Sequence, residues 1–103
     1  MSESWSEQYR LAAKAWVEAD AAAELLENLK SANLSQLMLS NHADSVSKAE
    51  MLAKASPKWT EYIEAMVAAR RKCNLLKVKL VWIQMKHREQ QSEEATARHE
   101  MKL

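Results

Sequence analysis

The residues of this chain that could do chemistry are mostly cationic. From Ala65 to Arg88 the sequence holds no acidic residue but seven basic ones. These are Arg70, Arg71, Lys72, Lys77, Lys79, Lys86 and Arg88. Basic side chains along a helix bind phosphate groups, and an aromatic ring among them can stack on a base. The window therefore indicates a nucleic-acid-binding or partner-binding helix face, with Trp82 as its stacking or docking residue.

A second interpretation gives the same charges a structural role. With Trp59 at heptad position a, two of the basic residues fall at position e and three at position g. The former are Arg70 and Lys77, and the latter are Lys72, Lys79 and Lys86. Residues at e and g form ion pairs between packed helices, and Asp20 and Glu27 occupy e-type positions earlier in the chain. The two interpretations are compatible if helix pairing leaves the g-side lysines exposed.

The usual catalytic and metal-binding groups form no recognisable constellation. Cys73 falls at a core heptad position, where cysteine acts as a small hydrophobe, and no histidine lies near it in sequence. His42, His87 and His99 lack the spacing of metal ligands. The chain has no glycine, which excludes glycine-rich nucleotide loops. We therefore expect a non-enzymatic protein with no cofactor, no metal and no small-molecule substrate.

The same lack of glycine, together with a single proline, predicts an all-α fold with few turns. One cysteine excludes an internal disulfide and suits a reducing cytoplasm. The first residues do not resemble a signal peptide, and no apolar run approaches the ~18 residues of a membrane span. We expect a cytoplasmic protein with no membrane contact.

The elements that position the basic window form one domain, 1–103, with three parts. An N-terminal helix, 1–30, is capped by Ser4 or Ser2 and carries a heptad stripe. The stripe is Trp5, Tyr9, Ala12, Trp16, Ala19, Ala23 and Leu26. A connector, 31–56, holds short helices, one of them starting at a capping box from Ser47 to Glu50.

The third part, 57–103, is a long C-terminal helix of coiled-coil type. Ser56 caps it and Pro57 takes the first helical position. Nine residues repeat at alternating spacings of three and four, the strongest periodic signal in the chain. They are Trp59, Tyr62, Met66, Ala69, Cys73, Leu76, Leu80, Ile83 and His87.

The two long helices differ in length, and this predicts self-association. At ~1.5 Å per residue they span roughly 39 Å and 65 Å, so the C-terminal helix should overhang its partner. The expected overhang carries Leu76, Leu80, Val81, Trp82, Ile83 and Met85. So much apolar surface requires a second chain. We expect a homo-oligomer whose interface comprises Cys73, Leu76, Leu80, Ile83 and His87.

The C-terminal half resembles a known group of proteins. The similar segments are Lys54–Trp59, Tyr62–Ile63, Met66–Arg70, Asn74–Leu80 and Gln91–Arg98. They resemble a family of small helical proteins that tailed phages and prophages encode among their early DNA-metabolism genes. The resemblance carries no catalytic motif. It implies a phage accessory protein in the bacterial host cytoplasm, acting with DNA or a DNA-processing protein.

These observations lead to two functional hypotheses. In the first, the chain is an oligomeric helical scaffold whose basic helix binds nucleic acid or a recombination or replication partner. In the second, it is a structural or inhibitory coiled-coil protein, such as an inhibitor of a host defence enzyme, whose basic face docks on an acidic protein surface.

Overall fold

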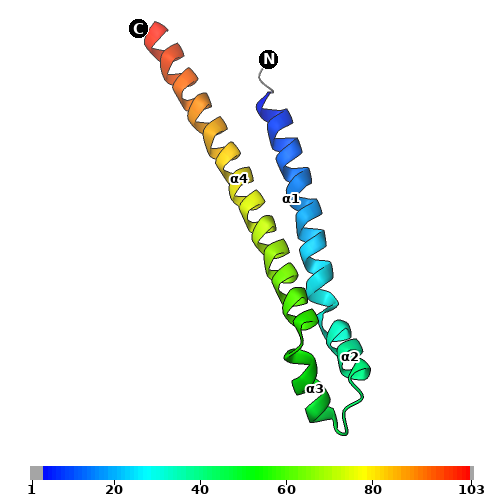
Figure 1. Ribbon diagram of the computed structural model, residues 1–103. Coiled ribbons are helices and arrows are strands. Elements are labelled where there is room, and N and C mark those ends of the chain that lie inside the picture. Colours follow the sequence, from blue (N-terminus) through cyan, green and yellow to red (C-terminus); the bar gives the residue numbers. More distant parts are fainter. Residues whose placement is uncertain (1–3, 103) are drawn as a thin grey trace.

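The computed structural model describes residues 4–102 and contains, within them, four α-helices and no strand. Helices α1 (Trp5–Asn28) and α4 (Pro57–Lys102) lie side by side and run in opposite directions (Figure 1). Helices α2 (Lys30–Ser40) and α3 (Val46–Lys54) form a smaller hairpin at one end. With 91% of the chain in helices, the predicted all-α fold, with its long C-terminal helix, shorter N-terminal helix and helical connector, is confirmed.

The molecule is a rod. Its principal extents are 84 × 20 × 18 Å and its radius of gyration is 23.3 Å. A compact domain of this length has a radius of gyration of about 13 Å. The elongation arises because α2 roughly continues the line of α1, while α3 leads into α4 from below (Figure 1).

The helix starts follow the expected capping chemistry in two places. Ser4 accepts a hydrogen bond from the backbone N–H of Glu7 at 3.2 Å and so caps α1. The alternative cap, Ser2, lies outside the described residues. Ser56 accepts a hydrogen bond from the N–H of Trp59 at 3.3 Å, and Pro57 begins α4 as predicted.

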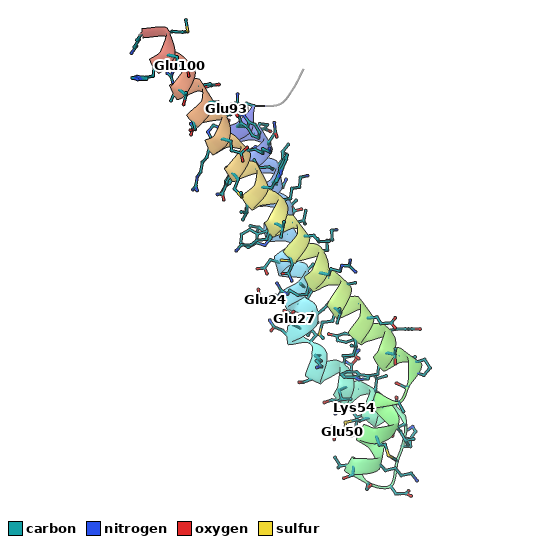
Figure 2. All side chains as sticks on the ribbon, turned by 90° about the vertical axis from the view of Figure 1, so that its left-hand side faces the viewer. Glu24, Glu27, Glu50, Lys54, Glu93 and Glu100 are labelled. Atoms are coloured by element: carbon teal, nitrogen blue, oxygen red, sulfur yellow. The ribbon has the colours of Figure 1, made fainter. Side chains whose placement is uncertain are left out.

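The connector differs from the prediction in its details. The N-terminal helix breaks at Leu29, and α2 then continues for 11 residues instead of one short turn. Helix α3 begins two residues early, because Ser45 rather than Ser47 accepts a hydrogen bond from the N–H of Lys48 at 3.2 Å. Glu50 pairs with Lys54 at 2.8 Å, along the exposed side of α3, instead of closing a capping box (Figure 2).

The core of the long hairpin is thin and built on alanine. Ala12, Ala19 and Ala23 are the buried residues of α1. Cys73, Leu80 and Ile83 are the buried residues of α4. Small side chains let the two backbones approach closely, and the indole rings of Trp5 and Trp16 close the edges of the cluster around Leu80.

The register between α1 and α4 overturns the predicted overhang. The Tyr62 hydroxyl donates to the Leu26 carbonyl, and the Trp5 indole N–H donates to the Gln90 side chain. Helix α1 therefore covers α4 from Tyr62 to Gln90, because α2 and α3 extend the rod instead of folding back along it. Only the last turns of α4, from residue 91 onward, project beyond α1, and Figure 2 shows Glu93 and Glu100 there.

The prediction that the overhang carries the apolar residues from Leu76 to Met85 is therefore wrong. Leu80 and Ile83 are buried against α1. The overhang itself is exposed throughout its described length and mostly polar, with Met101 as its one large apolar side chain.

Candidate functional site

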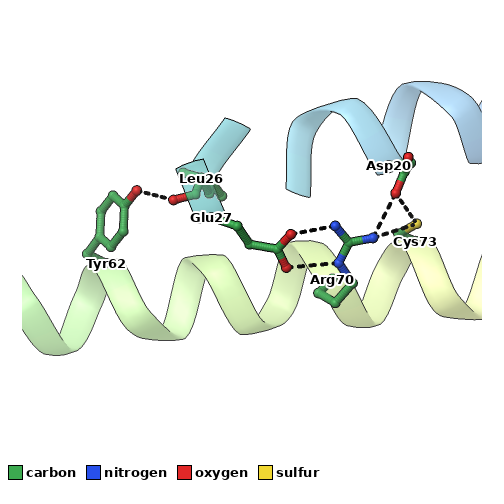
Figure 3. Close-up of polar contacts among 6 residues, drawn as sticks. All are labelled: Asp20, Leu26, Glu27, Tyr62, Arg70 and Cys73. Atoms are coloured by element: carbon green, nitrogen blue, oxygen red, sulfur yellow. Dashed lines mark hydrogen bonds and ion pairs between the residues drawn. The ribbon is translucent and has the colours of Figure 1, made fainter. Parts of the chain in front are cut away.

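Arg70 is the centre of an ion-pair network between the two long helices. Its guanidinium donates to the Glu27 carboxylate at 2.5 and 2.9 Å and to Asp20 at 2.7 Å (Figure 3). The same Asp20 oxygen lies 3.6 Å from the Cys73 thiol. This is the pairing that the heptad positions of these side chains indicated, and it occupies the donors that Arg70 would offer to a phosphate.

The network shifts the proton affinities of its members. Hydrogen bonds from Arg70 hold the pKa of Asp20 and the pKa of Glu27 below their ordinary values. The hydrogen bonds to Glu27 and then to Asp20 raise the pKa of Arg70. The triad is therefore fully ionised at neutral pH and holds α1 against α4.

Lys77 also faces α1. Its ammonium nitrogen lies 4.5 Å from the centroid of the Trp16 ring, within the range of a cation–π interaction. Lys77 and Arg70 are the two e-position cations of the sequence interpretation, and both contact α1.

Three other lysines form a separate line on α4, here named the lysine row: Lys72, Lys79 and Lys86. They lie seven residues apart, about 10.5 Å along the helix, and so project from one side. Lys86 pairs with Glu89 at 3.3 Å and lies 5.8 Å from the Trp82 ring centroid. Lys72 and Lys79 are exposed and make no ion pair among residues 4–102.

The remaining arginines of the basic window lie apart from the lysine row. Arg71 lines a shallow groove of about 420 Å³ together with Val67, Leu75 and Val78. Arg88 lines a different groove, of about 650 Å³, beside Trp5 and the other residues near the start of α1. The structure thus divides the seven predicted cations among the seam, the lysine row and two grooves.

The predicted oligomer interface lies inside the hairpin. Cys73, Leu80 and Ile83 are buried against α1 of the same chain, and Leu76 and His87 are half-buried beside them. The His87 ring lies 5.9 Å from the Trp5 ring. These residues form the seam between α1 and α4, so they are not available to a second copy while the hairpin is closed.

A different apolar surface faces solvent on α4, and we name it the outer face. Its six residues are 42–66% exposed: Val67, Leu75, Val78, Val81, Trp82 and Met85. Soluble monomers seldom expose a contiguous apolar patch. Such a patch commonly marks an interaction site. The sequence signal for this surface is a second apolar stripe, which the stronger stripe of the core concealed.

No group of metal-ligating side chains assembles within residues 4–102. No three histidine, cysteine or acidic side chains in this part of the chain come close enough to hold a metal ion. The Cys73 thiol is buried beside Arg70 and Asp20. The lysine row and the outer face are both exposed on α4, where a partner could reach them.

None of the helices, over the described part of the chain, has both the length and the apolar character needed to cross a bilayer. Comparisons of the chain with protein-family models, with curated proteins and with solved structures found no match.

Proposed function

We propose that this chain is a non-enzymatic assembly module. The helical hairpin binds a second copy of itself through the outer face of α4. The observation that carries this proposal is the row of six exposed apolar side chains on that face. A solvated helix normally places polar residues there.

The exposed area of the chain supports the same proposal. The chain exposes 8057 Å², whereas a typical globular monomer of its mass exposes about 5,900 Å². The excess of roughly 2,000 Å² is more than the ~800 Å² that each partner of a standard complex buries. The exposed surface of the chain is therefore large enough to form a stable interface.

Light scattering on the purified protein at micromolar concentration tests this proposal. We expect a mass above the 11.8 kDa of one chain. The double substitution Val78→Lys/Trp82→Lys places two charges in the interface and should give a folded monomer. A matched control is Val17→Lys, because Val17 is 58% exposed on α1, away from the outer face, and its substitution should leave the mass unchanged. A wild-type protein that is monomeric throughout would overturn the proposal.

A second function is favoured by the lysine row. Three lysines on one line, two of them without an ion pair among the described residues, suit a strand of phosphates better than a single acidic side chain. The proposed ligand is nucleic acid, in keeping with the phage-family resemblance of the C-terminal half. The lysine row would supply the phosphate contacts, while Trp82, next to Lys86, belongs to the outer face.

Fluorescence anisotropy of labelled single- and double-stranded oligonucleotides tests this second function. Binding should weaken steeply with salt, and the salt dependence should shrink in Lys72→Gln/Lys79→Gln. The control pair is Lys14→Gln/Lys30→Gln, which removes the same charge from exposed positions on α1 and at the start of α2. Absence of binding at low salt would leave the lysine row as a surface for an acidic protein.

A further inference from the structure

The outer face has a pattern that assigns both its occupant and its orientation. Six positions on this side of α4 follow one another at alternating spacings of four and three: Arg71, Leu75, Val78, Trp82, Met85 and Glu89. This is the repeat of a coiled-coil seam. All six residues are exposed, so the seam has no partner within the described chain.

We propose that two copies of this chain pair antiparallel through this seam, with Leu80 at the midpoint of the contact. This inference rests on the proposed function and specifies its partner and geometry. The order of residues in the seam is the basis of the proposal, because it starts with a cation and ends with an anion. An antiparallel copy in this register places Arg71 of one chain opposite Glu89 of the other, at both ends of the contact. A parallel copy would instead place Arg71 opposite Arg71 and Glu89 opposite Glu89.

The apolar layers of the seam fit the same register. Leu75 of one copy meets Met85 of the other, and Val78 meets Trp82. Each layer thus sets a larger or longer side chain against a smaller one, which lets the two helices interdigitate without voids. The contact runs from Arg71 to Glu89, about 27 Å of helix.

The position of the midpoint also supports the register. Leu80 lies at the centre of α4, which runs from Pro57 to Lys102. Two such helices would therefore overlap along their whole length, and each copy would offer the same surface to the other. An interface of this kind closes after two chains and does not continue into a fibre.

The pairing has a consequence for the lysine row. The two-fold axis of this dimer is perpendicular to the plane that contains the two α4 helices. Rotation about this axis therefore keeps the lysine rows of both copies on the same side of that plane. Lys79 then lies near Lys79 of the second copy, and Lys72 lies near Lys86 of the second copy. The dimer would gather six lysines along one face of the seam, twice the phosphate-binding charge of a single chain.

Cysteine cross-linking tests the register. Two proteins are made in a Cys73→Ala background, one with Leu75→Cys and the other, carrying a tag that changes its mass, with Met85→Cys. Under mild oxidation their mixture should give a disulfide-linked heterodimer. Each protein alone should stay uncross-linked, because an antiparallel pair separates the two copies of residue 75 by about 15 Å, beyond the ~7 Å reach of a disulfide.

The outcomes distinguish this inference from the proposed function. Homodimeric cross-links in each separate protein would show a parallel pair and overturn the inference. A dimeric mass in light scattering without any cross-link would also overturn it while leaving the assembly proposal standing. A monomeric mass for the wild-type protein would overturn both.

Charge reversal provides an independent readout of the same register. Arg71→Glu should weaken dimerisation by about tenfold, as should Glu89→Arg, because each sets like charges opposite one another at both ends of the seam. The double variant Arg71→Glu/Glu89→Arg should recover wild-type affinity. Glu24→Arg, at an exposed position of α1 outside the contact between the two α4 helices, is the control and should have no effect. Failure of the double variant to recover affinity would contradict the antiparallel register.

Discussion

At the scale of single residues, Arg70 holds the two arms of the hairpin together. Its guanidinium bridges Asp20 and Glu27, two carboxylates one heptad apart on α1. All three side chains are partly exposed, so solvent screens the interaction and its value lies in fixing the register of the arms.

Removing this cation should lower stability in a pH-dependent way. Because the pKa values of Asp20 and Glu27 are depressed in the folded state, their contribution is present above their unfolded pKa values of about 4 and is lost as the pH falls through the lower folded values. We expect Arg70→Gln to lower Tm by a few degrees at pH 7, with the difference from wild type shrinking as the pH falls below about 4.

Thermal unfolding followed by circular dichroism at several pH values measures this difference. The matched control is Arg10→Gln, which breaks a pair with Glu7 at 2.6 Å within α1 and should change Tm less. A Tm difference for Arg70→Gln that is the same at pH 2.5 and pH 7 would contradict the linkage to the carboxylates.

A second residue, His42, carries backbone strain. It has φ = 51°, in the left-handed region, at the turn between α2 and α3. The chain has no glycine to place there. His42→Gly should raise the free energy of unfolding by about 1 kcal/mol, because glycine adopts this conformation without the clash of a Cβ atom.

Urea denaturation of the His42→Gly variant checks this expectation. His99→Gly, in the helical backbone of α4, is the comparison and should give no gain. Equal or lower stability of His42→Gly would mean that the imidazole makes a contribution larger than the strain.

At the scale of the elements, the contact between α1 and α4 depends on small residues. Ala23 is fully buried at 0% exposure. Ala23→Leu should lower the free energy of unfolding by about 1–3 kcal/mol, because the extra carbons force the helices apart. Ala21→Leu adds the same volume at an exposed position of the same helix and should be nearly neutral. Urea denaturation of both variants measures the difference, and similar losses in the two would contradict a close alanine seam.

The sequence was sufficient to predict the elements but not their register. Local signals predicted the start of α1 at Ser4 or Ser2, of which the structure has Ser4, and the start of α4 at Ser56 and Pro57, because capping chemistry acts within a few residues. The position of α1 along α4 depends on how the connector folds, and neither the break at Leu29 nor the cap at Ser45 had a strong local signal.

The candidate site was predicted in part for the same reason. The pairing of Arg70 with Asp20 and Glu27 followed from heptad positions. The assignment of the core stripe to a second chain failed because α1 covers that stripe. The outer face could be identified only after the structure had shown that α1 of the same chain covers the core stripe.

At the scale of the whole molecule, the proposed dimer would add a second buried layer to a thin rod. A single pair of helices buries only alanine, one cysteine, one leucine and one isoleucine between its arms. Large apolar side chains of α4, Trp82 and Met85 among them, are left outside this core. In the proposed dimer, the outer face is where a second buried layer would form.

Small-angle X-ray scattering of the unmodified protein tests this account most directly, because it gives mass and length together. We predict twice the mass of one 11.8 kDa chain. The predicted longest dimension is about 100 Å, since the overlapping α4 helices span about 69 Å and one connector projects beyond each end. A mass of one chain with the 84 Å length of a single hairpin would contradict the account.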